Sequence, residues 1–353
     1  MRPLFHILGN VLRANVTTPP YPYKITIAVT YRCNSRCLTC GIWKRGFTPE
    51  MSLEDFDRFF RANPGLAWLD LTGGEVFLRK DFVAICAAAI RHCPNLALLH
   101  FPTNGLLVDH VVQGTRDILA LHPNRLIVSV SLDGPRELHD KIRGGKGFFD
   151  RAVATIRQLR TLASKRFQVF PGMTLSRENL GQIDSTLIAL RNEIPDFRPA
   201  ELHVNIAQVS EHFYGNKGMD LSFQSEALQE IHLFSRKRRL SFSAIHALEN
   251  AYLNLAERYI ETGKTPMSCQ ALSSSCFIHP DGRTHACVAD NEAIGMLSEF
   301  DYDLRNAWMS EKFVRVRRRI QRGECPQCWT PCEAYQTICS RLSTLAKASI
   351  LYI

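Results

Sequence analysis

Three cysteines near the start of the chain have the residue type and spacing of a metal-cluster loop. Cys33, Cys37 and Cys40 form the run CNSRCLTC, directly after the strand-like segment Ile25–Thr30. Thiolates are soft ligands that suit iron–sulfur clusters and zinc. A closed zinc site needs four ligands, and the next cysteine along the chain is Cys86. The spacing therefore favours a cubane cluster in which thiolates hold three irons and the fourth iron stays open to a ligand.

Strands and helices alternate after this cysteine loop (Cys33–Cys40). Apolar runs such as LIVSVSL suit parallel strands that are buried on both faces. Strands are expected at Lys24–Thr30, Ala67–Leu71, Ala97–Phe101, Arg125–Ser131, Gln168–Leu175 and Glu201–Val209. Helices are expected at Leu53–Ala62, Asp81–His92, Asp109–Leu121, Phe148–Ala163, Asn179–Glu193, Ser225–Leu240 and Ile245–Thr262. Six βα units in series predict a partial (β/α)6 barrel of the α/β class.

Polar motifs follow the first four of these strands. The cysteine loop comes first, and the others are Thr72-Gly73-Gly74-Glu75, Thr103-Asn104-Gly105 and Ser131-Leu132-Asp133-Gly134. Each motif alone is typical of a turn, but chemistry in parallel barrels gathers at the C-terminal ends of the strands. Glycine lets the backbone approach a ligand closely, and Glu75 could orient backbone amides or accept from an ammonium. The four motifs together predict one ligand site on this rim.

The CNSRCLTC run resembles the signature of the radical SAM superfamily. In that family the open iron binds the amino and carboxylate groups of S-adenosylmethionine (SAM), and one-electron reduction yields a 5′-deoxyadenosyl radical. The resemblance implies a [4Fe–4S] cluster at the cysteine loop. The segment HDKIRG after the fourth strand also resembles this family, in which an arginine at this place can pair with the SAM carboxylate. The SAM contacts that the resemblance implies are Gly73, Gly74, Glu75, Asn104, Ser131, Asp133 and Arg143.

Seven further cysteines gather in the last part of the chain. They are Cys269, Cys276, Cys287, Cys325, Cys328, Cys332 and Cys339. The region Met267–Cys339 resembles a SPASM or Twitch auxiliary-cluster domain, which implies at least one auxiliary [4Fe–4S] cluster. The preferred ligands are Cys269, Cys287, Cys325 and Cys328, and Cys276 or Cys332 could replace one of them. Four protein ligands predict a closed electron-transfer centre, three predict an iron free for substrate, and a structural zinc site is the alternative.

These features divide the chain into four parts: an N-terminal extension (1–23), the barrel (24–264), the auxiliary-cluster domain (265–340) and a tail (341–353). The auxiliary-cluster domain carries little expected helix before Arg305–Arg322. Apolar residues at helical spacing over Met1–Val16 predict either a short helix packed on the barrel or an interfacial helix that touches lipid. The apolar tail Leu345–Ile353 also fits lipid contact.

Composition bounds the class of protein. The 353 residues are 45% hydrophobic and 22% charged, so the chain can bury an ordinary core. Twelve cysteines without a signal peptide or an apolar run of membrane-spanning length indicate metal ligands in a reducing, cytoplasmic setting, with peripheral membrane contact as an option. Cys86 and Cys93 are expected to pack in the core.

The net charge of +9 is first interpreted as a basic, solvated surface. The basic runs Ser235–Leu240 and Arg315–Arg322 offer the sharper alternative of a docking site for an acidic reductant of the flavodoxin or ferredoxin type. Nucleic acid is not expected as a partner, because no recognised RNA-binding module accompanies the charge.

The sequence thus predicts a radical SAM enzyme that abstracts hydrogen from an unactivated carbon, leading to oxidation, crosslinking, epimerisation or carbon–carbon bond formation. Only about two dozen residues precede the first strand, so no leader-peptide module is expected, and a small metabolite or a lipid is the preferred substrate. Maturation of a ribosomally made peptide is the alternative. A non-catalytic iron–sulfur or zinc protein is the alternative of another class. No catalytic residue is predicted.

Overall fold

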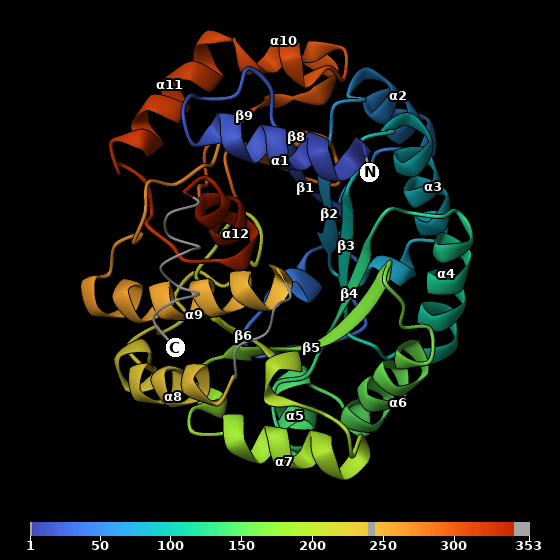
Figure 1. Cartoon of the computed structure of the whole chain (residues 1–353), viewed down its shortest axis with the longest axis vertical. Helices are drawn as coiled ribbons and strands as arrows, with labels where there is room; N and C mark the ends of the chain where they lie inside the picture. The colour runs from blue at the N-terminus through green and yellow to red at the C-terminus, as the bar shows by residue number, and fades with distance from the viewer. Residues whose placement is uncertain (1, 239–243, 342–353) are drawn as a thin grey trace.

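The computed structural model describes residues 2–238 and 244–341 of the chain. In this part of the chain, nine strands form one sheet in the order β6-β5-β4-β3-β2-β1-β7-β8-β9. The first six strands are parallel: β1 (Lys24–Thr30), β2 (Trp68–Gly73), β3 (Leu98–Thr103), β4 (Leu126–Ser131), β5 (Phe167–Leu175) and β6 (His203–Ile206). They curve into the partial barrel that the sequence predicts, with helices on the outside (Figure 1).

The outer helices follow the strands in chain order. They are α2 (Leu53–Ala62), α3 (Phe82–His92), α4 (Val108–Ala120), α6 (Phe148–Arg160), α7 (Ile183–Glu193), α8 (Gln224–Lys237) and α9 (Ala244–Thr262). Local sequence explains α2 well. Ser52 accepts from the Asp55 backbone N–H and Asp55 accepts from the Ser52 N–H, which is a capping box. Phe56, Phe59 and Phe60 then share the buried face.

Short elements complete the barrel. The helix α5 (Arg136–Arg143) follows the fourth strand and was not expected from the sequence. The described residues of the barrel also form the 3-10 turns η1 (Ile42–Lys44), η2 (Val76–Leu78), η3 (Arg177–Asn179) and η4 (Pro199–Glu201), and η5 (Leu297–Phe300) follows in the C-terminal region. The first two follow the cysteine loop and the Gly73–Glu75 motif, so the backbone turns sharply beside both.

The C-terminal cysteine region joins the same sheet. Its strands are β7 (Ser275–Ile278), β8 (Arg283–His285) and β9 (Ala293–Met296), and its helices are α10 (Leu304–Trp308), α11 (Glu311–Gln321) and α12 (Pro331–Cys339). Strand β7 runs parallel to β1 and covers the edge that β1 would otherwise leave unpaired. The boundary expected near residue 264 follows the end of α9, but the sheet continues across it.

In this region one helix prediction was wrong, and one helix was missed. The single helix expected at Arg305–Arg322 is two helices, because the chain turns at Met309 and Ser310. The sequence analysis also did not predict α12, which starts with a proline at its first position and lies against α9 (Figure 1).

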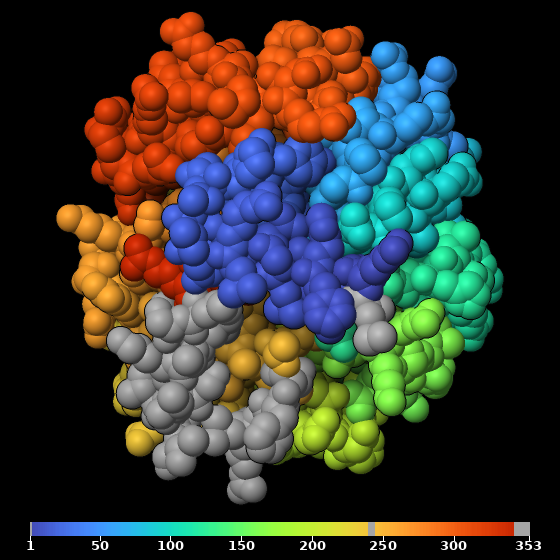
Figure 2. All heavy atoms as spheres, turned by 45° about the horizontal axis from the view of Figure 1, so that its top comes forward, coloured from blue at the N-terminus to red at the C-terminus, as the bar shows by residue number. Residues whose placement is uncertain are grey.

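The N-terminal extension forms α1 (Arg2–Ala14). Ile7 and Val11 pack against Tyr23 and Ala67. The same helix leaves the apolar residues Leu4, Phe5, Leu8 and Leu12 exposed. Figure 2 shows the N-terminal segment, in blue, on the surface beside the orange C-terminal region. The structure thus has the packed helix of the first prediction and the exposed apolar face of the second.

Some predictions lie outside the described residues. These are the tail 341–353 apart from Arg341, including Leu345–Ile353, and the last two residues of the run Ser235–Leu240. Among the described residues, no helix combines the length and apolar character needed to cross a membrane.

Candidate functional site

A cavity of about 380 Å³ lies inside the barrel at the C-terminal ends of its strands. Most of the predicted SAM and cluster contacts of the first domain line this cavity, together with one cysteine of the second. The predicted site residues in its wall are Cys33, Cys37, Cys40, Gly73, Gly74, Asn104, Ser131, Arg143 and Cys332. The predicted residues outside its wall are Glu75, Asp133, Cys269, Cys276, Cys287, Cys325 and Cys328.

The cysteine loop is bound tightly to the Gly73–Glu75 motif. The Gly74 N–H donates to the Thr30 carbonyl oxygen at 2.8 Å, and the Glu75 N–H donates to the Arg32 carbonyl oxygen at 2.8 Å. A Cβ atom at Gly74 would lie 2.2 Å from the Arg32 oxygen and 3.0 Å from the Cys33 Cβ. Glycine is therefore required here for the approach of the cysteine loop, whatever the motif binds.

Glu75 is fully buried and organises the next motif. Its carboxylate accepts from the Asn104 N–H at 2.7 Å and from the Thr103 hydroxyl at 2.9 Å, and it also accepts from the Phe77 N–H. Burial raises the pKa of Glu75, while these hydrogen bonds favour its charged form. Of the two roles considered for Glu75, the structure has it orienting backbone amides.

Asn104 connects this unit back to the cysteine loop. Its side-chain amide donates to the Asn34 side-chain oxygen at 2.7 Å, and its own oxygen accepts from the Leu106 N–H at 3.0 Å. The cysteine loop, the Gly73–Glu75 motif and the Thr103–Gly105 motif therefore form one hydrogen-bonded unit on the rim of the barrel.

Arg143 lies between the cavity and a buried carboxylate. Its Nε atom is 2.6 Å from an Asp133 carboxylate oxygen, and its Nη1 atom is 3.7 Å from the Cys37 Sγ. Burial opposes the charge on Arg143, but Asp133 and Cys37 outweigh it and raise the pKa of the guanidinium. Asp133 also accepts from the Thr174 N–H at 2.9 Å and lies behind Arg143, so Arg143 is the member of this pair that faces the cavity.

The thiols of the cysteine loop have the surroundings of cluster ligands. Cys33 and Cys40 each accept from the backbone N–H two residues later, that of Ser35 and that of Ile42. Hydrogen bonds to the sulfurs are one means by which proteins set cluster potentials. Burial raises the pKa of Cys33 to about 12 and that of Cys40 to about 11, so a bound metal must stabilise the thiolates.

The donor set of the cysteine loop suits an iron–sulfur cluster. Its three thiols come from one short loop and line the same cavity. Thiolates are the soft ligands that hold such clusters.

The C-terminal cysteines fall into groups. Cys269, Cys287 and Cys328 each accept from the backbone N–H two residues later, as in the cysteine loop. Burial raises the pKa of Cys269 and Cys287, and the nearby Cys328 raises both further. Cys325 acts in the same way on Cys269 and Cys328. These four thiols are the preferred ligand set, which stays a prediction.

The two possible replacements differ in position. Cys276 lies in β7 within the hydrophobic core, and no other cysteine is among the causes of its raised pKa. Cys332 lies in the first turn of α12, in the wall of the cavity, and its carbonyl oxygen accepts from the buried Lys24 ammonium. Cys86 and Cys93 pack in the core as expected.

The sequence analysis missed a polar row that crosses the inside of the barrel. Lys24 lies 3.1 Å from an Asp70 oxygen, the other Asp70 oxygen lies 3.1 Å from His100 Nδ1, and His100 Nε2 lies 3.0 Å from the Ser129 hydroxyl. Burial disfavours the charged forms of Lys24 and Asp70, but each stabilises the charge of the other. Asp70 therefore raises the pKa of Lys24, and Lys24 lowers the pKa of Asp70. Polar residues inside otherwise apolar strands were the available signal.

The two basic runs are partly structural. In α11, Arg317 is buried and donates to backbone carbonyls, Arg315 pairs with Glu292, and Arg319 pairs with Asp290. In the described part of the first run, Arg238 is buried and Lys237 pairs with Asp184. Most of these charges are already paired within the chain, so fewer positive side chains are left to bind an acidic reductant.

Two family descriptions match the chain in the order of its two cysteine groups. The radical SAM superfamily matches residues 27–188, and an iron–sulfur cluster-binding domain, SPASM, matches residues 269–332. Together they cover the cysteine loop, the strand-end motifs and most of the C-terminal cysteines.

Curated relatives cover part of the same range. The sporulation killing factor maturation protein SkfB of Bacillus subtilis (strain 168) is 24% identical over 79% of this chain and 63% of its own length. The subtilosin biosynthesis protein AlbA of the same organism is 31% identical over 43% of this chain and 35% of its own length. The Fe-coproporphyrin III synthase of Methanosarcina barkeri is 31% identical over 47% of this chain and 40% of its own length. The chain thus spans between 35% and 63% of these relatives.

Solved structures share the fold. SuiB of Streptococcus suis, bound to its precursor peptide SuiA, gives a TM-score of 0.60 at 17% identity over 89% of this chain and 70% of SuiB. The enzyme anSMEcpe with bound AdoMet gives 0.60 at 15% identity over 93% of this chain and 99% of its own. At these identities the likeness concerns the fold, and it extends across both cysteine groups.

Proposed function

We propose that this chain, which belongs to the radical SAM superfamily and carries a SPASM iron–sulfur domain, is an enzyme that modifies a ribosomally made peptide. The observation that carries the proposal is the shared cavity. Its wall holds the cysteine loop, the neighbouring SAM motifs and Cys332 of the second cysteine group. The cavity therefore borders the cysteine loop directly and reaches the second cysteine group at Cys332, while the four preferred ligands of that group lie outside its wall.

The residues of the cysteine loop would hold a [4Fe–4S] cluster with one open iron. Such a cluster, with SAM bound to it, supplies one-electron cleavage of the sulfonium and a radical able to take hydrogen from an unactivated carbon. The C-terminal cysteines would hold at least one auxiliary [4Fe–4S] cluster. Four ligands in that group make electron transfer its expected role.

The rim residues would bind and orient SAM beside the cysteine loop. Gly73 and Gly74 expose backbone to the cavity, and Asn104 and Ser131 offer polar groups there. Arg143 is fixed by Asp133 and faces the cavity, where a guanidinium suits a carboxylate. The polar row of Asp70, His100 and Ser129 also lines this cavity and would orient polar groups of the substrate.

The relatives favour a peptide over the small metabolite or lipid that the sequence analysis preferred. SkfB is named for the maturation of a sporulation killing factor and AlbA for the biosynthesis of a bacteriocin, and SuiB was crystallised with a precursor peptide. Another relative is named as a porphyrin-forming synthase, so a metabolite remains the competing outcome of the test.

The first experiment asks whether the chain performs radical SAM chemistry. The full-length protein is reconstituted with iron and sulfide without oxygen, reduced with dithionite and mixed with SAM. We expect 5′-deoxyadenosine to form slowly even without substrate. Protein that carries its clusters but forms none would support the non-catalytic iron–sulfur alternative and overturn the enzyme proposal.

The second experiment asks which substrate class is used. Candidate precursor peptides encoded near the gene are deuterated, and 5′-deoxyadenosine is analysed by mass spectrometry. We expect deuterium transfer from one peptide. Transfer only from a deuterated tetrapyrrole precursor or lipid, with active protein, would leave the radical chemistry standing and overturn the peptide assignment.

A further inference from the structure

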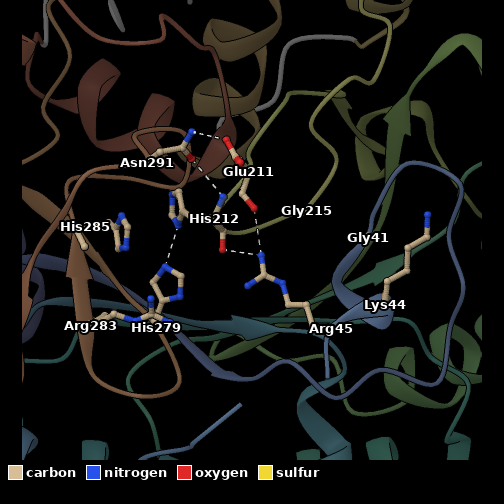
Figure 3. Close-up of a pocket in the computed structure, with 11 residues that line it drawn as sticks. Gly41, Lys44, Arg45, Glu211, His212, Gly215, His279, Arg283, His285 and Asn291 are labelled. Atoms are coloured by element: carbon tan, nitrogen blue, oxygen red, sulfur yellow. Dashed lines mark hydrogen bonds between the residues drawn. The ribbon is translucent and has the colours of Figure 1, made fainter. Parts of the chain in front are cut away.

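A second pocket, of about 440 Å³, lies outside the barrel where the segment after β6 meets β7 and β8. Its inner wall carries His212, His279 and His285, whose rings face one another in Figure 3. One ligand nitrogen from each of the three lies within 4.8 Å of the others. None of these histidines borders the cavity of the proposed active site.

Each imidazole has an oxygen partner on the side away from the group. His212 Nε2 lies 3.1 Å from the Cys287 carbonyl oxygen, and His285 Nδ1 lies 3.1 Å from the Asp290 carbonyl oxygen. Since a carbonyl only accepts, these two nitrogens carry hydrogen. His279 Nδ1 lies 2.6 Å from the Tyr31 hydroxyl, which can also accept. Metal-binding histidines almost always donate their second N–H to such an oxygen.

The nitrogens left for a metal are therefore His212 Nδ1, His279 Nε2 and His285 Nε2. His212 Nδ1 and His279 Nε2 lie 2.8 Å apart, and a proton shared between them accounts for this contact without a metal. His285 Nε2 is different. The residue is 2% exposed, and this nitrogen has no hydrogen-bond partner among the described residues. A buried polar atom without a partner needs an explanation.

We propose that His212, His279 and His285 bind a single divalent transition-metal ion, with zinc as the fitting metal, and leave a coordination position open to the pocket. Imidazole nitrogens suit zinc, and three of them with one open position is a known zinc arrangement. The unpaired nitrogen of His285 is the observation that a hydrogen-bonded histidine pair alone does not explain.

Metal binding requires a small rearrangement. Zinc–nitrogen bonds of about 2.0–2.1 Å place neighbouring ligand nitrogens about 3.3 Å apart. The His212 and His285 rings are parallel, with centroids 4.1 Å apart, so their lone pairs cannot point at one ion until one ring tilts. His285 is the ring expected to tilt, because its Nε2 gives up no hydrogen bond.

The open position would take water or a small anion. Lys44, Arg45 and Arg283 line the same pocket. Arg45 already donates to the backbone carbonyls of Glu211, His212 and Phe213, and Arg283 pairs with Asp281 at 2.7 Å. Among the described residues, Lys44 has no carbonyl or carboxylate partner, and its ammonium rests over the Trp43 ring. A carboxylate or phosphate entering the pocket would meet this positive surface.

The test uses full-length protein whose iron–sulfur clusters are already filled, so that the cysteines cannot take the added metal. Zinc bound per chain is measured with a competing chelator for wild type, His285→Gln and His279→Gln. The matched control is His92→Gln, which removes a histidine paired with Asp57 elsewhere. We expect the first two variants to lose more than about 100-fold in zinc affinity. Changing a residue that only hydrogen-bonds to a metal ligand already costs about 10–100-fold. His92→Gln should bind zinc like wild type.

Cobalt identifies the ligands without a variant. Cobalt held by nitrogen gives weak visible bands, whereas cobalt held by thiolates adds an intense sulfur-to-metal charge-transfer band. The spectrum of wild type with cobalt should lack that band. X-ray absorption spectroscopy at the zinc edge should show imidazole ligands and no sulfur ligand. Equal zinc affinity in all four proteins, no binding by wild type, or sulfur ligation would each overturn the proposal. None of these readings depends on SAM cleavage, so the site can fail while the proposed function stands.

Discussion

The two cysteine groups carry the same ligand chemistry in different surroundings. The cysteine loop extends β1 and opens into the barrel cavity, while β7 pairs along the other side of β1 and leads to the second group. The four preferred ligands of the second group lie outside the cavity wall. A thiolate group with free space beside it can bind and activate a small molecule, whereas one closed in by protein is limited to passing electrons. The difference is one of position and space rather than of residue type.

The largest effect is expected from the open group. Cys37→Ala removes one of three ligands, so the cysteine loop should lose its cluster and 5′-deoxyadenosine formation should fall below detection. The iron of the C-terminal group should remain, which iron analysis and absorption can show. Cys86→Ala is the control, because Cys86 packs inside α3 and has no metal role here. If Cys37→Ala still cleaves SAM, the two groups have been assigned the wrong way round.

Close packing against the loop should matter almost as much. At Gly74 a Cβ would lie 2.2 Å from the Arg32 carbonyl oxygen, so Gly74→Ala should displace Cys33 and weaken cluster binding there by at least about tenfold. Gly172 also lines the cavity but has nothing within 4 Å of a built Cβ. Gly172→Ala should therefore retain the cluster. Iron and sulfide per chain measure both, and equal loss in the two variants would contradict the steric argument.

The closed group can be resolved by two matched substitutions. Cys328→Ala should lose the auxiliary cluster, because Cys328 interacts with three other preferred ligands. Cys276→Ala should keep it, since Cys276 lies within a core strand, and should cost only about 1 kcal/mol of stability. Electron paramagnetic resonance of the reduced proteins distinguishes the clusters. Loss of the auxiliary signal in Cys276→Ala alone would replace the preferred ligand set.

The smallest effect concerns the support behind Arg143. His139 accepts from the Asp133 N–H at 3.0 Å, and burial, followed by the charge of Arg143, lowers its pKa to about 4. The unfolded chain takes up this proton near pH 6.5, and the folded chain does so only near its lower pKa. His139 therefore destabilises the fold as the pH drops through this window, and its contribution vanishes above it.

Urea unfolding at pH 7 and pH 5 checks this sign. Wild type should lose about 2 kcal/mol more than His139→Gln between these two pH values. The same loss in both proteins would mean that His139 is not buried in its neutral form. Arg143, which pairs with Asp133 beside the cysteine loop, would then be held less firmly than the structure shows.

Local patterns predicted much of this molecule. The strand Lys24–Thr30 and the helix Leu53–Ala62 have the expected bounds, because an apolar run and a capping box are both set by neighbours in the chain. The strand-end motifs could also be placed on one rim, since parallel strands end at the same edge. The break at Met309 and Ser310 was missed, because the helical pattern of the surrounding residues hides a short turn.

The remaining features depend on which strands become neighbours. Asp70, His100 and Ser129 are separate single residues in the sequence, and only the order β2-β3-β4 makes them a hydrogen-bonded row. His212, His279 and His285 likewise come from two distant segments that meet beyond β7. The type and spacing of the cysteines determined by themselves that this chain can hold iron–sulfur clusters. Only the tertiary structure decided which cysteines border free space, because a cavity is formed by residues that are far apart in the chain.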